Sequence, residues 1–466
     1  LADVAGALPR ILHGRGHDVR VFMPWHGCMS PPDPVPVERA REVELRLGAH
    51  ALRFSLFETR LPGSDVPLYL VRCPEVYDRA TLYTEEPDEH LRFLVLQRAA
   101  LEGCQRLVFA PDVVHCNDWH TALVPLLLKT TYAWDRLFAG TRTVLTIHNV
   151  GYQGVFPRGT LDDVGADLHT QVTPGAHVNW LREGIRHATR VSTVSPTYAW
   201  EICTPLGGHG LDEVLRARRD GVVGILNGVD YSAWNPATDR YLEHRYSATD
   251  LSGKTANKRQ LLERMALSVG VDTPLVGVVS RMTVQKGFDL LFEALPELLT
   301  MRDFALAVLG SGEPRYQDFF VGLTRHFPDR VALHLGYDEA LAHHIEAAAD
   351  MFLMPSMYEP CGLNQLYSLK YGTVPIVRRT GGLADSVQMW DPVTRSGTGV
   401  VFEHFDANGV SWALHTALDL YKDRSAWRTL MRNGMAQDFS WDKQSREYER
   451  LYASALSGST AHDATG

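Results

Sequence analysis

The sequence predicts an α/β protein of two doubly wound, Rossmann-like parallel-sheet domains in tandem, with an inter-domain cleft between two facing sheets. Three observations predict this fold class. Apolar runs of strand length alternate with segments of helical spacing, as in βαβ units. These runs form two series, one in each half of the chain. The 466 residues, 45% hydrophobic and 22% charged, favour two globular domains over a single core.

The first series of strand-like runs lies in the first half of the chain. Apolar residues at helical spacing open the sequence from Leu1 to Leu12, and a strand-like run follows them. Polar residues end the later runs of this series. Since ligands bind at the carboxyl ends of strands in open parallel sheets, these ends are candidate site positions. The strand-like runs cover residues 17–24, 112–118, 143–149 and 191–195.

The second series begins after a polar stretch that ends near Arg259 and is the predicted hinge region. We expect an N-terminal domain at 1–225, a C-terminal domain at 226–440 and a last helix at 441–458 that crosses back to the first domain. The predicted strands of the second series lie at 275–280, 304–309, 331–335, 351–354, 374–377 and 399–402.

Charge and composition exclude several classes of protein. The formal net charge of −9 and pI near 6.1 argue against a nucleic-acid-binding protein, which needs a basic face. No apolar run reaches the roughly 20 residues of a membrane helix, so no membrane partner is expected. The six cysteines form no C-x-x-C pair, which favours a reducing, cytoplasmic compartment over a disulfide scaffold.

Two cations follow the first strand of the second series. Arg281 comes just after the strand, and Lys286 lies five residues on, before a helix expected near Phe288. A guanidinium fork and an ammonium group at one sheet edge suit a diphosphate whose charge grows as it leaves. The spacing alone leaves open a solvated turn with two unrelated cations.

Two later turns of the second series repeat this plan. Glu359 lies in a turn after an apolar strand, where a carboxylate can hold sugar hydroxyls, and Gly362 permits a close backbone approach. One strand later, Thr380 precedes Gly381 and Gly382, whose amides could face an anion. An ordinary tight turn remains the alternative for each motif.

Polar residues also end the strands of the first series. His148 follows one strand, and His115, Asp118 and His120 follow another. A lone histidine is more often a satisfied core residue than a reactive one. No third element supplies a partner at metal-ligand spacing, so we expect no protein-bound catalytic metal.

Two phosphate-loop patterns are set aside. Ser252-Gly-Lys-Thr255 resembles the end of a Walker loop, but Ala248 stands at the first glycine position and no long apolar strand precedes it. Gly310-Ser-Gly312 follows a strand, but Arg315 replaces the third glycine of a dinucleotide fingerprint. A nicotinamide-cofactor enzyme is therefore not expected.

Together the motifs resemble the bacterial glycogen synthase and plant starch synthase family, glucosyltransferases of the GT-B fold that use ADP-glucose. The Glu359-Pro-Cys-Gly segment is the most selective, because related retaining transferases usually carry a second glutamate where this chain has Tyr367. The resemblance runs almost end to end. Its matching stretches are 1–9, 16–20, 117–120, 146–149, 194–198, 224–230, 281–287 and 359–385.

The resemblance implies roles for individual residues. Arg281 and Lys286 would neutralise the donor's phosphates, with backbone support from Thr380, Gly381 and Gly382. No metal and no cofactor are implied.

The remaining roles concern the nucleotide base and the sugar. Tyr337 matches the aromatic residue expected against adenine, and Glu359 and His148 would hold the transferred glucose. The other substrate-binding positions that the resemblance implies are Asp118, Asn227, Cys361 and Gly362.

The sequence departs from the family pattern at its start. The family has a strand and a Lys-x-Gly-Gly motif just before the segment that begins here at Leu1. We expect the first sheet of the chain as given to lack a central strand, and the donor site to lack a lysine and two backbone contacts.

The resemblance implies transfer of glucose from ADP-glucose to the non-reducing 4-hydroxyl of an α-1,4-glucan such as glycogen, with retention of the anomeric configuration. Sugar hydrolases use paired carboxylates, and the motifs contain no such pair. Two alternatives stay open. One is another GT-B transferase, such as a UDP-sugar, sucrose-type or trehalose-type synthase. The other is a truncated, inactive glucan-binding protein.

Overall fold

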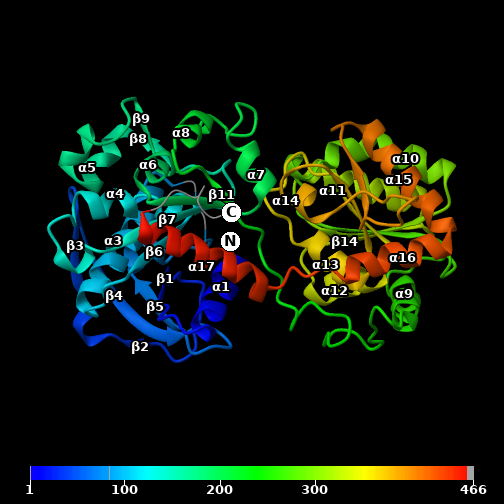
Figure 1. Cartoon of the computed structure of the whole chain (residues 1–466), viewed down its shortest axis with the longest axis horizontal. Coiled ribbons are helices and arrows are strands. Elements are labelled where there is room, and N and C mark those ends of the chain that lie inside the picture. The colour runs from blue at the N-terminus through cyan, green and yellow to red at the C-terminus, as the bar shows by residue number, and fades with distance from the viewer. Residues whose placement is uncertain (1, 83, 85, 459–466) are drawn as a thin grey trace. The chain divides into compact units, whose positions relative to one another are not determined.

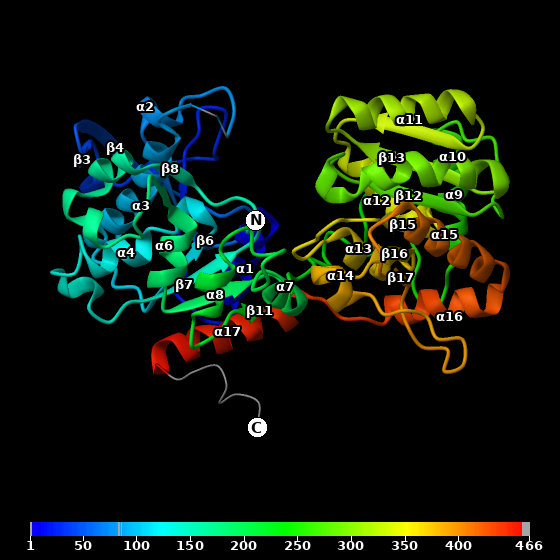
Figure 2. The same cartoon turned by 90° about the horizontal axis from the view of Figure 1, so that it is seen from above.

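The computed structural model describes residues 2–82, 84 and 86–458. The chain forms two compact units, each visible in Figures 1 and 2. Unit 1 comprises Leu1–Val194, Ala199–Ile225 and Gln444–Gly466, and unit 2 comprises Ser195–Tyr198 and Leu226–Lys443. The chain therefore enters unit 2 briefly at Ser195–Tyr198 and again at Leu226, and it returns to unit 1 for most of its last helix.

The described strands of unit 1 form two larger sheets and one antiparallel pair, β8 with β9. A four-stranded sheet in the order β11-β10-β7-β6 is parallel throughout. A second sheet, β1-β5-β4-β2 with β3 on β4, is mixed. The strands are β1 (Val21–Pro24), β2 (Val35–Pro36), β3 (Val43–Leu47), β4 (His50–Arg60), β5 (Pro67–Arg72), β6 (Val113–Asn117), β7 (Arg142–Ile147), β8 (Val155–Pro157), β9 (His177–Asn179), β10 (Arg190–Thr193) and β11 (Val223–Gly224).

The antiparallel part of unit 1 was not predicted from the sequence. β3 pairs with β4 across a turn at Gly48, and β4 pairs with β5 in antiparallel register. The sequence did contain a signal for β3. The apolar residues Val43, Leu45 and Leu47 alternate with polar residues, and in the structure the apolar ones are buried while those between them are exposed. This alternation is the ordinary pattern of a half-buried strand.

The helices of unit 1 include the predicted first helix, whose residue Leu1 lies outside the described residues. Val4, Leu8 and Leu12 of this helix are buried, as the helical spacing predicted. The helices are α1 (Ala2–Gly14), α2 (Pro74–Tyr77), α3 (Glu89–Arg106), α4 (Val124–Lys129), α5 (Leu161–Val164), α6 (Trp180–His187), α8 (Asp212–Arg216) and, from Gln444 on, α17 (Trp441–Ser457). Helix α7 (Pro196–Glu201) is divided between the units, because residues up to Tyr198 belong to unit 2.

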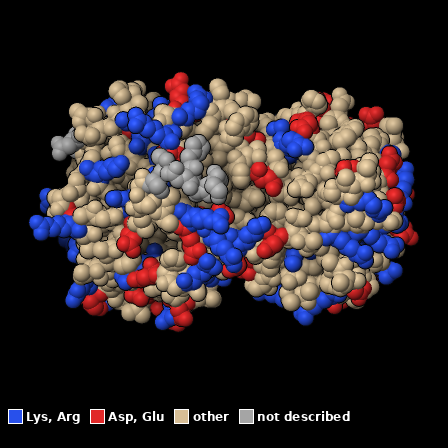
Figure 3. Space-filling model, viewed as in Figure 1, with Lys and Arg blue, Asp and Glu red and all other residues tan. Residues whose placement is uncertain are grey.

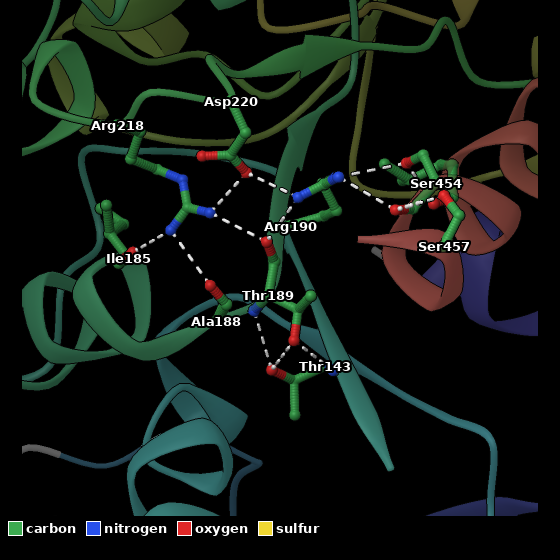
Figure 4. A network of polar contacts seen from close by, with 10 residues as sticks. Thr143, Ile185, Ala188, Thr189, Arg190, Arg218, Asp220, Ser454 and Ser457 are labelled. Atoms are coloured by element: carbon green, nitrogen blue, oxygen red, sulfur yellow. Dashed lines mark hydrogen bonds and ion pairs between the residues drawn. The ribbon is translucent and has the colours of Figure 1, made fainter. Parts of the chain in front are cut away.

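Helix α17 is tied to the four-stranded sheet by polar contacts. The guanidinium of Arg190, on β10, donates to the Ser454 carbonyl over 2.9 Å, and its other edge faces Asp220 at 3.5 Å. Figure 4 shows that Arg218 shares the Asp220 carboxylate, at 2.6 Å. These contacts join the sheet, the chain before β11 and the last helix into one polar network.

A second tie runs through His115 on β6. Its Nδ1 lies 2.8 Å from the Tyr452 hydroxyl of α17, and its Nε2 lies 2.6 Å from the Thr146 hydroxyl of β7. Thr146 in turn contacts the Ser192 hydroxyl of β10 at 2.7 Å. Burial lowers the pKa of His115 to about 4, so the ring is neutral and structural.

Unit 2 contains a single six-stranded sheet that is parallel throughout, in the order β14-β13-β12-β15-β16-β17. Helices cover both faces of the sheet (Figure 1). The strands are β12 (Leu275–Val279), β13 (Ala305–Gly310), β14 (Val331–Leu335), β15 (Met351–Met354), β16 (Val374–Arg378) and β17 (Val400–Phe402). Each strand matches a predicted run.

Alternation along the strands divides the core of unit 2 between the two faces. Val276 and Val278 enter one cluster, whereas Leu275 enters the other. Helices α10, α11, α15 and α16 contribute to the first cluster, and α9 and α12 to the second. The helices are α9 (Ser252–Arg264), α10 (Leu291–Met301), α11 (Pro314–His326), α12 (Glu339–Ala348), α13 (Asn364–Tyr371), α14 (Gly381–Ser386), α15 (Ala407–Lys422) and α16 (Arg424–Met435).

The dismissed Walker-like segment is a helix start. Lys254, near the beginning of α9, is buried, and its ammonium donates to the Thr373 hydroxyl at 2.7 Å and to the Ala347 carbonyl at 3.1 Å. Burial lowers the pKa of Lys254 to about 7. The residue therefore faces the protein interior and not a phosphate.

The surface carries charges of both signs (Figure 3), and the cysteines are unpaired. Basic side chains (Lys or Arg) and acidic side chains (Asp or Glu) are both found on the face drawn in Figure 3. Within the described part of the chain, no helix combines the length and apolar character that crossing a membrane requires. All six cysteines are free thiols.

Candidate functional site

The loop after β12 carries the two predicted cations. Arg281 is exposed, and its side chain makes no hydrogen bond or ion pair with a described residue. Lys286 ends a 3₁₀ turn at Val284–Lys286, and Gly287 follows with φ of +73°. A Cβ at Gly287 would stand 1.9 Å from the Pro355 carbonyl oxygen, so this close crossing of two loops requires glycine.

Lys286 and Glu359 form an ion pair in the structure. The Lys286 ammonium lies 2.6 Å from Glu359 Oε2, with 19% and 6% of the two side chains exposed. The buried Ser356 hydroxyl donates to the same oxygen over 3.1 Å. No described residue donates to Oε1 of Glu359. One carboxylate oxygen is therefore held by protein, while the other keeps its lone pairs for a ligand.

This ion pair was missed by the sequence reasoning, which gave the two residues separate partners. Lys286 follows β12 and Glu359 follows β15, and these strands are neighbours in the sheet. More than 70 residues separate them in the chain, so the sequence does not show that their loops meet. Ser356, three residues before Glu359 in the same turn, was also missed.

The glycines after β16 serve loop packing in this structure. We expected the Gly382 amide to face a phosphate. In the structure this amide donates to the Glu359 carbonyl over 3.0 Å and is therefore not free for a phosphate. A Cβ at Gly381 would lie 2.0 Å from the Glu359 carbonyl oxygen, and a Cβ at Gly382 would lie 2.0 Å from that of Cys361. Lys286 thus contacts the side-chain carboxylate of Glu359, and Gly382 contacts the backbone carbonyl of the same residue.

Cys361 and Asn227 lie against each other. The Asn227 amide donates to Cys361 Sγ over 3.4 Å, and burial raises the pKa of this thiol to about 12. Asn227 is 8% exposed, and no described residue donates to its side-chain carbonyl oxygen. Gly362 has φ of +71° and faces the Gln365 amide. The thiol is therefore a neutral packing group, and the Asn227 oxygen is an unused acceptor.

The last two predicted residues of unit 2 differ in exposure. Thr380 is 2% exposed and precedes α14. Tyr337 follows β14 and is 87% exposed. The structure thus brings Lys286, Glu359 and the glycine turn into contact. Arg281 shares no partner with them among the described residues.

Unit 1 holds the other predicted site residues, Asp118 and His148. Asp118 Oδ1 accepts the His148 amide at 2.7 Å and the Asn149 amide at 3.4 Å. Asp118 has φ of +53°, a strained value for a non-glycine residue. Burial raises the pKa of Asp118 to about 6, although the two amides partly offset this. The carboxylate therefore fixes the backbone that carries His148.

His148 is 8% exposed, and burial holds its pKa well below the usual range. Its Nε2 lies 2.9 Å from Asn117 Oδ1, so the Nε2–H donates and Nδ1 is left as an acceptor. A neutral imidazole with one free acceptor can bind a sugar hydroxyl. His120, by contrast, stacks on Trp119 with ring centroids 4.1 Å apart.

In residues 2–82, 84 and 86–458, no three His, Cys, Asp or Glu side chains gather where they could hold a metal ion. The site chemistry described above rests on one ion pair, one neutral imidazole and backbone groups.

Two family models match the chain. The model of the starch synthase catalytic domain matches residues 1–217, and the model of glycosyl transferases group 1 matches residues 262–433. A glycogen synthase of Anaeromyxobacter sp. is 46% identical over 97% of this chain and 95% of its own length. A glycogen synthase of Koribacter versatilis is 44% identical, with 98% and 94% covered.

Solved structures give the same result. The catalytic domain of starch synthase IV from Arabidopsis thaliana, bound to ADP and acarbose, is 36% identical with a TM-score of 0.89, covering 98% of this chain and 95% of that one. A sucrose-phosphate synthase from Thermosynechococcus elongatus shares the fold, at 19% identity, a TM-score of 0.60 and 97% and 92% coverage.

Proposed function

Because the chain belongs to the glycogen and starch synthase family of glycosyltransferases, we propose that it transfers glucose from ADP-glucose to the non-reducing 4-hydroxyl of an α-1,4-glucan, with retention of the anomeric configuration. One observation carries the choice of donor. The Arabidopsis structure was solved with ADP, the nucleotide that ADP-glucose leaves behind. Its second ligand, acarbose, is an oligosaccharide and supports a glucan acceptor.

The proposed donor site uses the charges of unit 2. Arg281 and Lys286 bind the diphosphate of the donor. The Lys286 ammonium has three hydrogens, and its contact with Glu359 uses one of them. Positive charge next to the diphosphate stabilises the negative charge that develops as the bond to glucose breaks. Tyr337 packs against the adenine, and the Thr380 to Gly382 turn supports the loops from behind.

Glu359 and His148 make the proposed contacts with the sugar. Glu359 accepts a glucose hydroxyl through Oε1, and His148 accepts one through Nδ1. Asp118, Asn227, Cys361 and Gly362 shape their surroundings. Asp118 acts through the His148 backbone, and the buried side-chain oxygen of Asn227 has no donor among the described residues.

The chemical step follows from these roles. The bond between the anomeric carbon and the diphosphate oxygen breaks, and a bond forms between that carbon and the acceptor's 4-oxygen. The diphosphate takes up the proton that the acceptor hydroxyl loses. No protein carboxylate pair is required, and exclusion of water favours transfer over hydrolysis. The six free thiols support the further proposal that the reaction takes place in the reducing cytoplasm.

The test compares two donors on one acceptor. Purified protein is incubated with glycogen and either ADP-glucose or UDP-glucose carrying labelled glucose. Label in the glycogen and nucleotide release are measured, with a reaction lacking glycogen as the hydrolysis control. Faster transfer from ADP-glucose is expected. Faster transfer from UDP-glucose would overturn the donor, and glycogen binding without transfer from either donor would indicate a glucan-binding protein.

A further inference from the structure

The turn that carries Glu359 is held along its backbone by donors outside it. The carbonyls of Ser356 and Met357 both accept from the Arg378 guanidinium, the first through Nε at 3.0 Å and the second through Nη2. The next carbonyl, of Tyr358, accepts from the Gln285 side chain at 3.4 Å. The Glu359 carbonyl accepts from the Gly382 amide. Four consecutive carbonyls of the turn are thus fixed from outside it.

Arg378 is placed to hold this turn. It is the last residue of β16, next to β15, from which the turn emerges. Its guanidinium carbon lies 5.4 Å from the centre of the Phe405 ring. The guanidinium is planar and directs two donors in a fixed fork, so it can bind two adjacent carbonyls at once, which a lysine cannot do.

The fixed turn determines which carboxylate oxygen of Glu359 is offered to a ligand. Ser356, inside the turn, and Lys286, next to Gln285, both contact Oε2. The Met357 amide also donates to the Gln285 carbonyl at 2.9 Å, which aligns the Lys286 loop with the turn. A shift of the Ser356 backbone would therefore rotate the carboxylate and disturb both donors to Oε2.

We propose that Arg378 is a positioning residue of the glucosyl-transfer site, because its guanidinium holds the Ser356 and Met357 carbonyls and thereby sets the direction of the Glu359 carboxylate. The inference rests on the proposed function. Arg378 acts on the sugar through Glu359 and on the nucleotide only through the Lys286 contact with Oε2, so its loss lowers kcat more than it weakens ADP binding. A displacement of about 1 Å at a reacting centre can cost about 100-fold in rate.

The experiment compares wild type, Arg378→Met, Arg378→Lys and Arg379→Met. Arg379 is the matched control, since its side chain is 48% exposed and pairs at the surface with Glu403. The kcat and KM for ADP-glucose are measured with glycogen, together with the inhibition constant of ADP and the melting temperature. Arg378→Met should lower kcat by about 10- to 100-fold, with a much smaller change in the ADP inhibition constant. Arg378→Lys should recover part of kcat, and Arg379→Met should match wild type.

The other possible results decide either the positioning role of Arg378 or the proposed function. A kcat of Arg378→Met within twofold of Arg379→Met contradicts positioning, and so does an ADP inhibition constant that rises in step with the loss of kcat. If Arg378→Met does not fold, Arg378→Lys decides: lowered kcat at the wild-type melting temperature supports the inference, and wild-type kcat overturns it. If wild type itself transfers no glucose from ADP-glucose, the proposed function fails, and the inference fails with it for that separate reason.

Discussion

The two units hold their site residues at similar places, just after parallel strands, but stabilise them in opposite ways. In unit 1, Asp118 and His148 are buried, and burial shifts both pKa values toward the neutral forms. In unit 2, Lys286 and Glu359 are paired as opposite charges at 2.6 Å. The arrangement in unit 1 depends on hydrogen-bond geometry, whereas the arrangement in unit 2 depends on the opposite charges of Lys286 and Glu359. Isosteric neutral substitutions should therefore be tolerated in unit 1 and harmful in unit 2.

The largest effect is expected from breaking the ion pair. Lys286→Met leaves the Glu359 carboxylate buried without its cation and removes a phosphate ligand. We expect kcat to fall about 10²- to 10³-fold and the free energy of unfolding to fall by about 3 kcal/mol. Activity assays and calorimetry measure the two effects.

The double variant Lys286→Met/Glu359→Gln separates these effects. It removes the unpaired charge, so the melting temperature should return most of the way to that of wild type while kcat stays low. A melting temperature of the double variant no higher than that of Lys286→Met would show that charge pairing is not what stabilises the unit 2 site.

The second largest effect is expected at Gly381, because the unit 2 site also depends on close backbone contact between loops. Gly381→Ala places a methyl group 2.0 Å from the Glu359 carbonyl, at φ of +43°, and should lower the free energy of unfolding by about 2 kcal/mol or more. Gly322→Ala is the control, since nothing lies within 4 Å of its Cβ in α11, and it should stabilise by about 0.5–1 kcal/mol. Equal melting temperatures for both variants would contradict this account.

The smallest effect is a pH dependence in unit 1. The folded pKa of Asp118 is raised to about 6 from 3.8, so between these values the folded state binds more protons than the unfolded state. Asp118 therefore makes wild type lose stability as the pH rises from about 4 to about 6, by at most roughly 1.4 kcal/mol for each step of one in pH. Asp118→Asn keeps the acceptor for the His148 amide and lacks this dependence.

The measurement is the difference in melting temperature between Asp118→Asn and wild type from pH 4 to pH 8. The melting temperature of Asp118→Asn minus that of wild type should rise from pH 4 to about pH 6 and stay constant above that value. Curves that run parallel from pH 4 to 6 would show that the Asp118 carboxyl titrates alike in both states.

The sequence predicted the strands of unit 2 well, because buried parallel strands are continuous apolar runs. It placed Lys286 and Glu359 correctly at strand ends, but their contact depends on β12 lying beside β15, and strand order is not written in local sequence. The role of Gly382 was misjudged for the same reason. Its amide faces a neighbouring loop whose position no local pattern gives.

Unit 1 was predicted less completely. The runs that became β6, β7 and β10 were found, but β2 to β5 were not, although alternation in residues 43–47 was visible. Arg378 also escaped notice, since a surface-like Arg-Arg pair gives no sign that one side chain turns inward to two carbonyls. Contacts between loops that are distant in sequence are thus what separates the prediction from the structure.

The return of the last helix to unit 1 has a consequence for synthesis. Residues 444–457 reach the ribosome exit only after all of unit 2, yet Arg190 and His115 of unit 1 use Ser454 and Tyr452 as partners. During translation, unit 2 can complete its own core while unit 1 still lacks these partners. The N-terminal half of the molecule is therefore the last to be finished, which reverses the usual order in which domains mature from the N-terminus.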